Sequence, residues 1–126
     1  MLFHLMGCSP STQMPDGDYT HGVYKFTFSE EWVSGWPFGG WDFVYTYDGE
    51  EIKNGHKILF SLELFTFYSI EVNVMERRNP ENSYSVTFPA AICDSGGGET
   101  EIIVTGSNGK TTTYKITCDI TQVGKR

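Results

Sequence analysis

The chain has 126 residues, a formal net charge of -7 and an aromatic content of 15%. This length suits one domain, and the apolar and aromatic content can fill a core, which excludes an intrinsically disordered chain. The acidic balance excludes nonspecific nucleic-acid binding and direct electrostatic docking on an anionic membrane, because both need clustered lysine and arginine. Threonine, tyrosine, phenylalanine, valine and isoleucine recur in short runs without helical periodicity, so the composition favours β-strands.

The first apolar run of the chain ends at a cysteine. The sequence Leu5-Met6-Gly7-Cys8 resembles the lipobox of bacterial lipoproteins, in which the cysteine carries a lipid and becomes the mature N-terminus. Residues 9–18 are polar and rich in proline, glycine and hydroxyl side chains, as is usual in the tail behind such a cysteine. The resemblance implies an extracytoplasmic, cell-envelope lipoprotein that contacts the membrane only through a lipid at Cys8. A signal peptide would need a longer apolar run and a basic start, so the alternative is a disordered tail with a free thiol.

This N-terminal pattern divides the chain into three parts. Residues 1–18 form a leader remnant and a flexible linker, residues 19–123 form the globular domain, and residues 124–126 form a frayed C-terminus.

Alternation of apolar and polar side chains predicts strands throughout the globular domain. In chain order they are residues 23–28, 41–47, the extended run 56–78 with a break near 66–69, 84–88, 100–105 and 111–120. Turn residues separate them at 48–55, at 79–82 and at the two-residue hairpin turn Asn108-Gly109. About seven short strands with this spacing are typical of an antiparallel β-sandwich.

The segment GSNGKTTTYKITCDI, residues 106–120, is similar to the closing strands of bacterial immunoglobulin-like domains in surface proteins. The resemblance covers the last third of the chain. It implies an all-β, immunoglobulin-like antiparallel β-sandwich behind a disordered N-terminal tail, although the Cys…Trp…Cys spacing of antibody domains is absent.

The chain has three cysteines, Cys8, Cys93 and Cys118. A lipid on Cys8 would leave the other two to pair. If residues 94–98 form a tight hairpin within one sheet, Cys93 and Cys118 flank a strand about 9.5 Å apart, beyond the roughly 7 Å limit for a disulfide. If these residues carry the chain to a facing sheet, the pair can bridge. The Cys93–Cys118 disulfide is therefore a hypothesis that depends on topology, and two buried, reduced cysteines are the alternative.

No catalytic, phosphate-binding or metal-binding motif occurs in the sequence. His4, His21 and His56 are dispersed, and neither His-x-x-x-His nor Cys-x-x-Cys spacing is present. Carboxylates at Asp16-Gly17-Asp18 and at residues 48–51 match no EF-hand loop, so calcium is a minor alternative. We therefore predict a protein that is not an enzyme and that has no metal site and no cofactor.

All three tryptophans lie in the stretch WVSGWPFGGW, residues 32–41. Its glycines and proline predict a loop for Trp32, Trp36 and Phe38, whereas Trp41 begins an alternating strand and is predicted to be core. Aromatic rings on rigid loops stack on sugars or anchor protein partners at low entropic cost. We therefore assign Trp36, Phe38 and Trp32 as candidate ligand-binding residues. The alternative is that these rings fold inward as a small core beneath the loop, with Trp32 closing one end of the sandwich.

Together, these patterns predict a non-catalytic binding or adhesion-type module on a surface-anchored lipoprotein. A glycan or a protein, and not a nucleic acid, is the expected partner of its aromatic loop. The alternative is a structural or accessory domain of the cell envelope without a ligand pocket.

Overall fold

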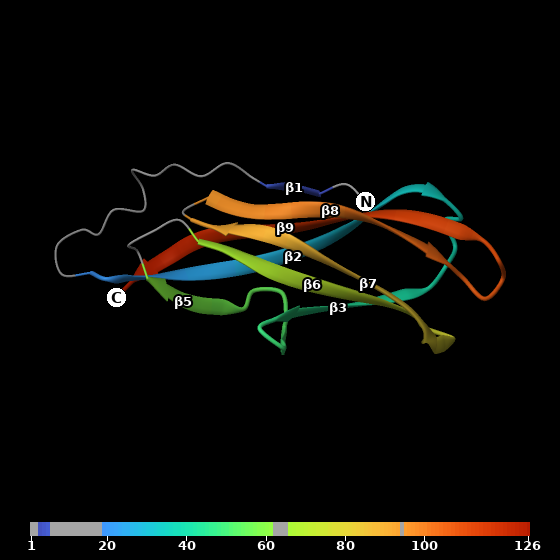
Figure 1. Cartoon of the computed structure of the whole chain (residues 1–126), viewed down its shortest axis with the longest axis horizontal. Coiled ribbons are helices and arrows are strands. Elements are labelled where there is room, and N and C mark those ends of the chain that lie inside the picture. Colours follow the sequence, from blue (N-terminus) through green and yellow to red (C-terminus); the bar gives the residue numbers. More distant parts are fainter. Residues whose placement is uncertain (1–2, 6–18, 62–65, 94) are drawn as a thin grey trace.

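A computed structural model describes residues 3–5, 19–61, 66–93 and 95–126 of the chain. These residues form nine β-strands and no helix, which confirms the prediction of an antiparallel all-β fold. The strands are β1 (Phe3–Leu5), β2 (His21–Gly35), β3 (Trp41–Tyr47), β4 (Glu50–Ile52), β5 (Lys57–Ser61), β6 (Thr66–Glu76), β7 (Asn79–Ile92), β8 (Ser95–Thr105) and β9 (Thr111–Lys125). They form one antiparallel sheet in the order β4-β3-β6-β7-β8-β9-β2-β5, with β1 paired to β8; Figure 1 labels all of these strands except β4.

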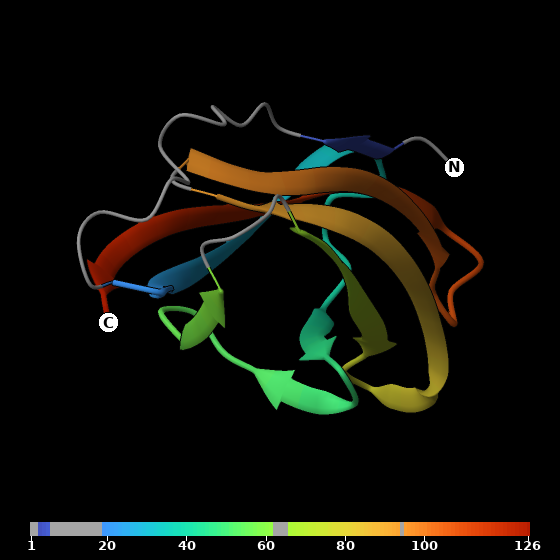
Figure 2. The same cartoon turned by 60° about the vertical axis from the view of Figure 1, so that its left-hand side comes forward.

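The sheet curls because β7 and β8 meet at one end only. Ala91 and Gly97 form the single paired position between these two strands in the described part of the chain. Away from that position β7 follows β6 and β8 follows β9. The sheet thereby acquires two halves, β4-β3-β6-β7 and β8-β9-β2-β5, which curve around a common core (Figure 2). The predicted sandwich has two separate sheets, whereas here one continuous sheet turns back on itself.

The core forms where inward side chains of the two halves interlock. Phe28 of β2 stacks on Tyr45 of β3 with ring centroids 4.0 Å apart. Phe60 of β5 packs against Tyr68 of β6 at 4.8 Å. Each such pair contributes about 0.5–1.5 kcal/mol beyond the burial of its apolar area. Trp41 at the start of β3 is only 7% exposed, which confirms its assignment to the core.

The loop between β4 and β5 ties the two ends of the sheet together. The Asn54 side chain accepts a hydrogen bond from the Phe28 N–H (2.5 Å) and donates one to the Phe28 carbonyl (3.1 Å). The backbone of Gly55 and His56 continues this pattern along Phe26. The loop therefore satisfies backbone groups of β2 as a neighbouring strand would.

Several strand boundaries differ from the predicted ones. Strand β2 runs on to Gly35, so Trp32 lies on a strand and not on a loop. Pairing with β9 supplies the backbone partners that the local sequence does not predict, and a bulge between Trp32 and Ser34 absorbs the irregularity. In the long run, β5 ends at Ser61 and β6 begins at Thr66, so the predicted break near residues 66–69 falls within a strand.

The β6–β7 turn lies at Arg77-Arg78, two residues before the predicted 79–82 turn. Pro80 is accommodated in β7 because its missing N–H removes no ladder bond at the start of a strand. The other chain end also differs from prediction: β9 continues to Lys125, and the backbones of Arg126 and His21 exchange hydrogen bonds of 2.7 and 2.8 Å. The C-terminal residues are therefore held in the sheet and do not fray.

The β8–β9 turn is longer than the predicted two-residue turn. Thr105 pairs with Thr111. Within the turn, the Gly109 N–H donates to the Gly106 carbonyl, and the Gly106 N–H donates to the Lys110 carbonyl. Gly109 has a φ of 78°, the left-handed conformation that such a bulged turn needs. The longer turn shifts the register by one residue and places the inward side chains of β8 opposite those of β9.

The described structure overturns the Cys93–Cys118 disulfide. Cys118 is free and buried, whereas Cys93 is disulfide-bonded. Because β8 lies between β7, which precedes Cys93, and β9, which carries Cys118, the two cysteines flank one strand. Burial raises the pKa of the Cys118 thiol to about 12 and makes it unreactive at neutral pH. Cys8 and the predicted flexible linker lie outside the described residues.

The close approach of backbones beside the β7–β8 corner predicts a strict requirement for glycine. A Cβ at Gly97 would lie 1.9 Å from the Cys118 carbonyl oxygen, and the φ of Gly97 is +122°. We expect Gly97→Ala to lower the free energy of unfolding by about 3 kcal/mol or more, as measured by urea denaturation. Gly49→Ala is the matched control, because Gly49 has a φ of +80° and no atom within 4 Å of the added Cβ; it should cost about 1 kcal/mol. Equal losses in the two variants would contradict this packing.

Candidate functional site

Three connections between strands gather at the end of the molecule on the right of Figure 1. The Trp36 N–H donates to the Thr111 carbonyl (2.9 Å), and the Arg77 N–H donates to the Gly40 carbonyl (3.0 Å). These backbone bonds join loops that are far apart in the sequence into one surface. The connections are the β2–β3 loop at residues 36–40, the β6–β7 turn at residues 77–78 and the β8–β9 turn at residues 106–110.

A groove of about 510 Å³ lies among these connections. It is lined by aromatic, charged and hydrogen-bonding side chains and by glycine backbone: Trp36, Phe38, Gly39, Gly40, Glu76, Arg77, Arg78, Ser107 and Asn108. Two of the three predicted ligand-binding residues, Trp36 and Phe38, are therefore brought together. Trp32 is 48% exposed on β2 and does not line this groove.

The aromatic wall of the groove consists of Trp36 and Phe38. Their ring centroids are 5.5 Å apart at an interplanar angle of 81°, an edge-to-face contact. The exposed fractions are 37% for Trp36 and 80% for Phe38, so neither ring folds into the core as the alternative interpretation required. The Thr112 hydroxyl donates to the Trp36 carbonyl at 2.7 Å, and the Lys110 ammonium lies 5.5 Å from the Trp36 ring centroid. The loop thus holds two exposed rings in a fixed arrangement.

The opposite wall is organised by Glu76. One carboxylate oxygen accepts a hydrogen bond from the Ser107 N–H at 2.9 Å. The other oxygen accepts from the Ser107 hydroxyl and from the Asn82 amide (3.3 Å). The bonds from Ser107, its side chain first, lower the pKa of Glu76 below its usual value. Glu76 is therefore an ionised anchor for the β8–β9 turn.

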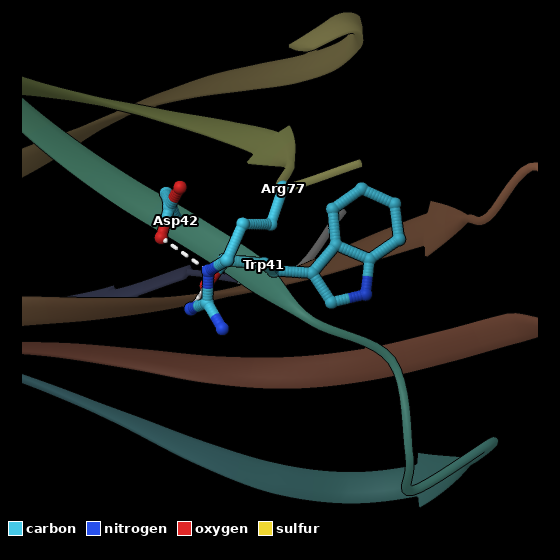
Figure 3. A network of polar contacts seen from close by, with 3 residues as sticks. All are labelled: Trp41, Asp42 and Arg77. Carbon is cyan, nitrogen blue, oxygen red and sulfur yellow. Dashed lines mark hydrogen bonds and ion pairs between the residues drawn. The ribbon is translucent and has the colours of Figure 1, made fainter. Parts of the chain in front are cut away.

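Arg77 fixes the β6–β7 turn against β3. Figure 3 shows its guanidinium beside Asp42, on the other side of the β3 backbone from the Trp41 ring. Its Nε donates to an Asp42 carboxylate oxygen at 3.0 Å, and its Nη2 donates to the Trp41 carbonyl at 3.1 Å. Because both partners of this ion pair are exposed, it contributes little to stability, but it positions the turn. Arg78 belongs to neither of the two ion pairs among the described residues.

A second hollow, of about 300 Å³, lies beside Glu30, Tyr45 and Glu51. The Tyr45 hydroxyl donates to a Glu30 carboxylate oxygen at 2.5 Å. Burial, and after it this hydrogen bond, raise the pKa of Tyr45 far above its ordinary value. Tyr45 is therefore a neutral structural hydroxyl, which is unsuited to release a proton during a reaction.

Across the described ranges, no group of three or more His, Cys, Asp or Glu side chains is placed to hold a metal ion. The same residues include no helix with the length and apolar character needed to cross a membrane. Comparison with known proteins finds no matching family model, curated protein or solved structure.

Sequence reasoning missed the polar half of the groove. Arg77-Arg78 and Ser107-Asn108 both border turns, and turns are where functional side chains concentrate. Nothing local shows that these turns meet Trp36, because that proximity depends on the pairing of β2 with β9 and of β3 with β6.

The depressed pKa of Glu76 predicts that acid loosens the β8–β9 turn. The ionised carboxylate stabilises the turn fully above the ordinary glutamate pKa of 4.5, and this contribution is lost as the pH falls through the lower folded-state value. We expect the Ser107 amide proton to lose protection against exchange, relative to its intrinsic rate at each pH, and its NMR signal to shift as the pH falls below 4.5. In Glu76→Gln the turn should be loosened at neutral pH, with no titration in this range. A wild-type Ser107 signal that is flat through this pH range would contradict the assignment.

Proposed function

We propose that the chain is a non-catalytic, extracytoplasmic binding module that recognises a glycan through the groove at Trp36 and Phe38. The observation that carries this proposal is the pair of exposed rings, fixed edge-to-face on one wall of a groove of about 510 Å³ whose other wall is polar. A sugar ring has an apolar face of C–H groups and a rim of hydroxyls. The aromatic wall suits the face, and the polar wall suits the rim.

The volume of the groove suits a small ligand. Pockets for small molecules have volumes of roughly 300–1,000 Å³, and this groove falls within that range. The Asn108 side chain also suits a hydroxylated ligand, because its oxygen accepts from the Lys110 N–H at 2.9 Å and its amide nitrogen can donate to a sugar.

Two observations support an extracytoplasmic location. Cys93 is disulfide-bonded, and disulfides persist in oxidising compartments. The hairpin over residues 106–120 is similar to the closing strands of immunoglobulin-like domains in bacterial surface proteins. The proposal includes the expectation that the domain is related to immunoglobulin-like domains.

The aromatic wall supplies the test of glycan binding. We expect Trp36→Ala to weaken binding to a glycan selected from an array by about ten-fold or more, because loss of a stacking ring at a binding hot spot costs 2 kcal/mol or more on a rough scale. Isothermal titration calorimetry measures the affinity. Trp32→Ala is the matched control, since it removes an exposed tryptophan outside the groove.

Equal binding by wild type and Trp36→Ala would contradict the groove assignment. If no glycan binds the wild-type protein, the proposed binding function is contradicted, and the alternative of a structural or accessory domain is favoured. Circular dichroism spectra of both variants show whether the fold is intact.

The lipid anchor at Cys8 is a separate part of the proposal, supported by the Leu5-Met6-Gly7-Cys8 pattern. Two features of the fold oppose it. Residues 3–5 form β1 on β8, and cleavage before Cys8 would remove this strand. Cys93 is disulfide-bonded while Cys118 is free, and a cysteine sulfur that carries a lipid cannot form a disulfide. A lipidated Cys8 therefore requires Cys93 to pair with a different cysteine.

Mass spectrometry of the protein purified from its native envelope decides between these states. Lipidation predicts a mature chain that begins at Cys8, carries the mass of its acyl groups and partitions into detergent. Cys8→Ser should abolish both properties. A chain that retains Met1, with the Cys8 sulfur recovered in a disulfide-linked peptide, would contradict the anchor.

A further inference from the structure

We propose that the groove selects glycans whose sugars carry a carboxylate, such as the uronic acids. This inference rests on the proposed function and names the class of glycan. It follows from the charges that surround the aromatic wall.

The groove is a basic region on an acidic protein. The whole chain has a net charge of -7 and only nine Lys and Arg residues. Two of those residues, Arg77 and Arg78, line the groove, and a third, Lys110, lies over its Trp36 ring. This concentration of cations opposes the overall charge, so it favours an anionic ligand at this one place.

The acidic side chains of the region, Glu76 and Asp42, have hydrogen-bond partners, but only Asp42 is paired with a cation; Glu76 keeps its negative charge, which leaves three cations against two carboxylates. Glu76 accepts hydrogen bonds from Ser107 and Asn82 on its two oxygens. Asp42 is paired with Arg77 at 3.0 Å. These partners leave Arg78 and Lys110 as the cations of the groove that take part in no ion pair among the described residues.

Arg78 is suited to a carboxylate by its shape as well as its charge. A guanidinium presents parallel N–H donors that match the two oxygens of a carboxylate, and such charge-assisted pairs are about twice as strong as neutral hydrogen bonds. Behind the bonds from Ser107, the positive charge of Arg78 helps to lower the pKa of Glu76, but the two side chains form no ion pair among the described residues.

The carboxylate of a uronic acid projects from the edge of the sugar ring, while the C–H groups form its face. A ring stacked on Trp36 or Phe38 directs its edge along the groove, whose lining includes Arg78. A uronic acid thus satisfies both the aromatic and the basic residues of the site. A neutral hexose satisfies only the aromatic ones.

The test uses polysaccharides in matched pairs. Polygalacturonate, alginate and hyaluronate are each compared with a carboxyl-reduced form, in which the uronic acid becomes a neutral hexose of the same linkage. Neutral glucans and mannans complete the panel. Affinity electrophoresis and titration calorimetry of the full chain should show binding to at least one acidic member and about ten-fold or more weaker binding to its reduced partner.

Variants of Arg78 separate specific recognition from general charge. Arg78→Gln should remove most of the preference for the acidic form while Trp36-dependent binding of the reduced form persists. Arg78→Lys, which keeps the charge but loses the planar fork, should retain an intermediate preference. Arg126→Gln is the matched control, because it changes the net charge equally at the opposite end of the molecule in Figure 1 and should leave binding unchanged.

The outcomes distinguish this inference from the proposed function. Equal binding to acidic and reduced forms, or an acidic preference that survives in Arg78→Gln, overturns the carboxylate selectivity and leaves glycan binding intact. Failure of the wild-type protein to bind any member of the panel, acidic or neutral, counts against the proposed function and the inference together.

Discussion

The close backbone contact at the β7–β8 corner is the constraint on which the rest of the structure depends. A Cβ at Gly96 would lie 2.2 Å from the Ala91 carbonyl oxygen, so only glycine allows the two strands to approach as they do. The strands separate beyond this contact, and one sheet becomes two halves that curve around a common core. Without such a corner, the apolar face of an antiparallel sheet would need a second structural element to cover it. Here the two halves of the same sheet cover each other. The aromatic core and the arrangement of the sheet ends both follow from it.

The same curvature brings residues from three distant connections to one end of the molecule. The aromatic rings of the groove are held by backbone bonds, such as that from Trp36 to Thr111, and not by burial. The polar wall is held separately. Glu76 at the end of β6 binds Ser107 of the β8–β9 turn, and Arg77 of the β6–β7 turn binds Asp42 of β3. Residues that fix the loops are thus distinct from those, like Arg78, that remain available to a ligand. This division allows a rigid, exposed site whose ordering cost is met during folding.

Local patterns predicted the strands well where alternation is strong and less well where turn residues compete with pairing. Residues 41–47 form β3 with the predicted bounds, because every second side chain from Trp41 to Tyr47 is apolar. Pro80 and Gly35 suggested turns, yet both lie within strands because a neighbouring strand supplies the backbone partners. The predicted loop at Trp32 was wrong for the same reason. Strand pairing is a long-range interaction, and it outweighs a local preference of about 1 kcal/mol or less.

The sequence by itself determined the buried face of the strongly alternating strands, such as β3 and β9, and it placed Trp36 and Phe38 on an irregular connection. Both results follow from short-range geometry, the period of two along a strand and the turn preferences of glycine and proline. Only the tertiary structure decided which strands are neighbours. That choice kept Cys93 from pairing with Cys118 and brought Arg78 into the same groove as the aromatic rings. Any strand with an apolar face can pair with several others, so the partner is selected by the packing of the whole chain.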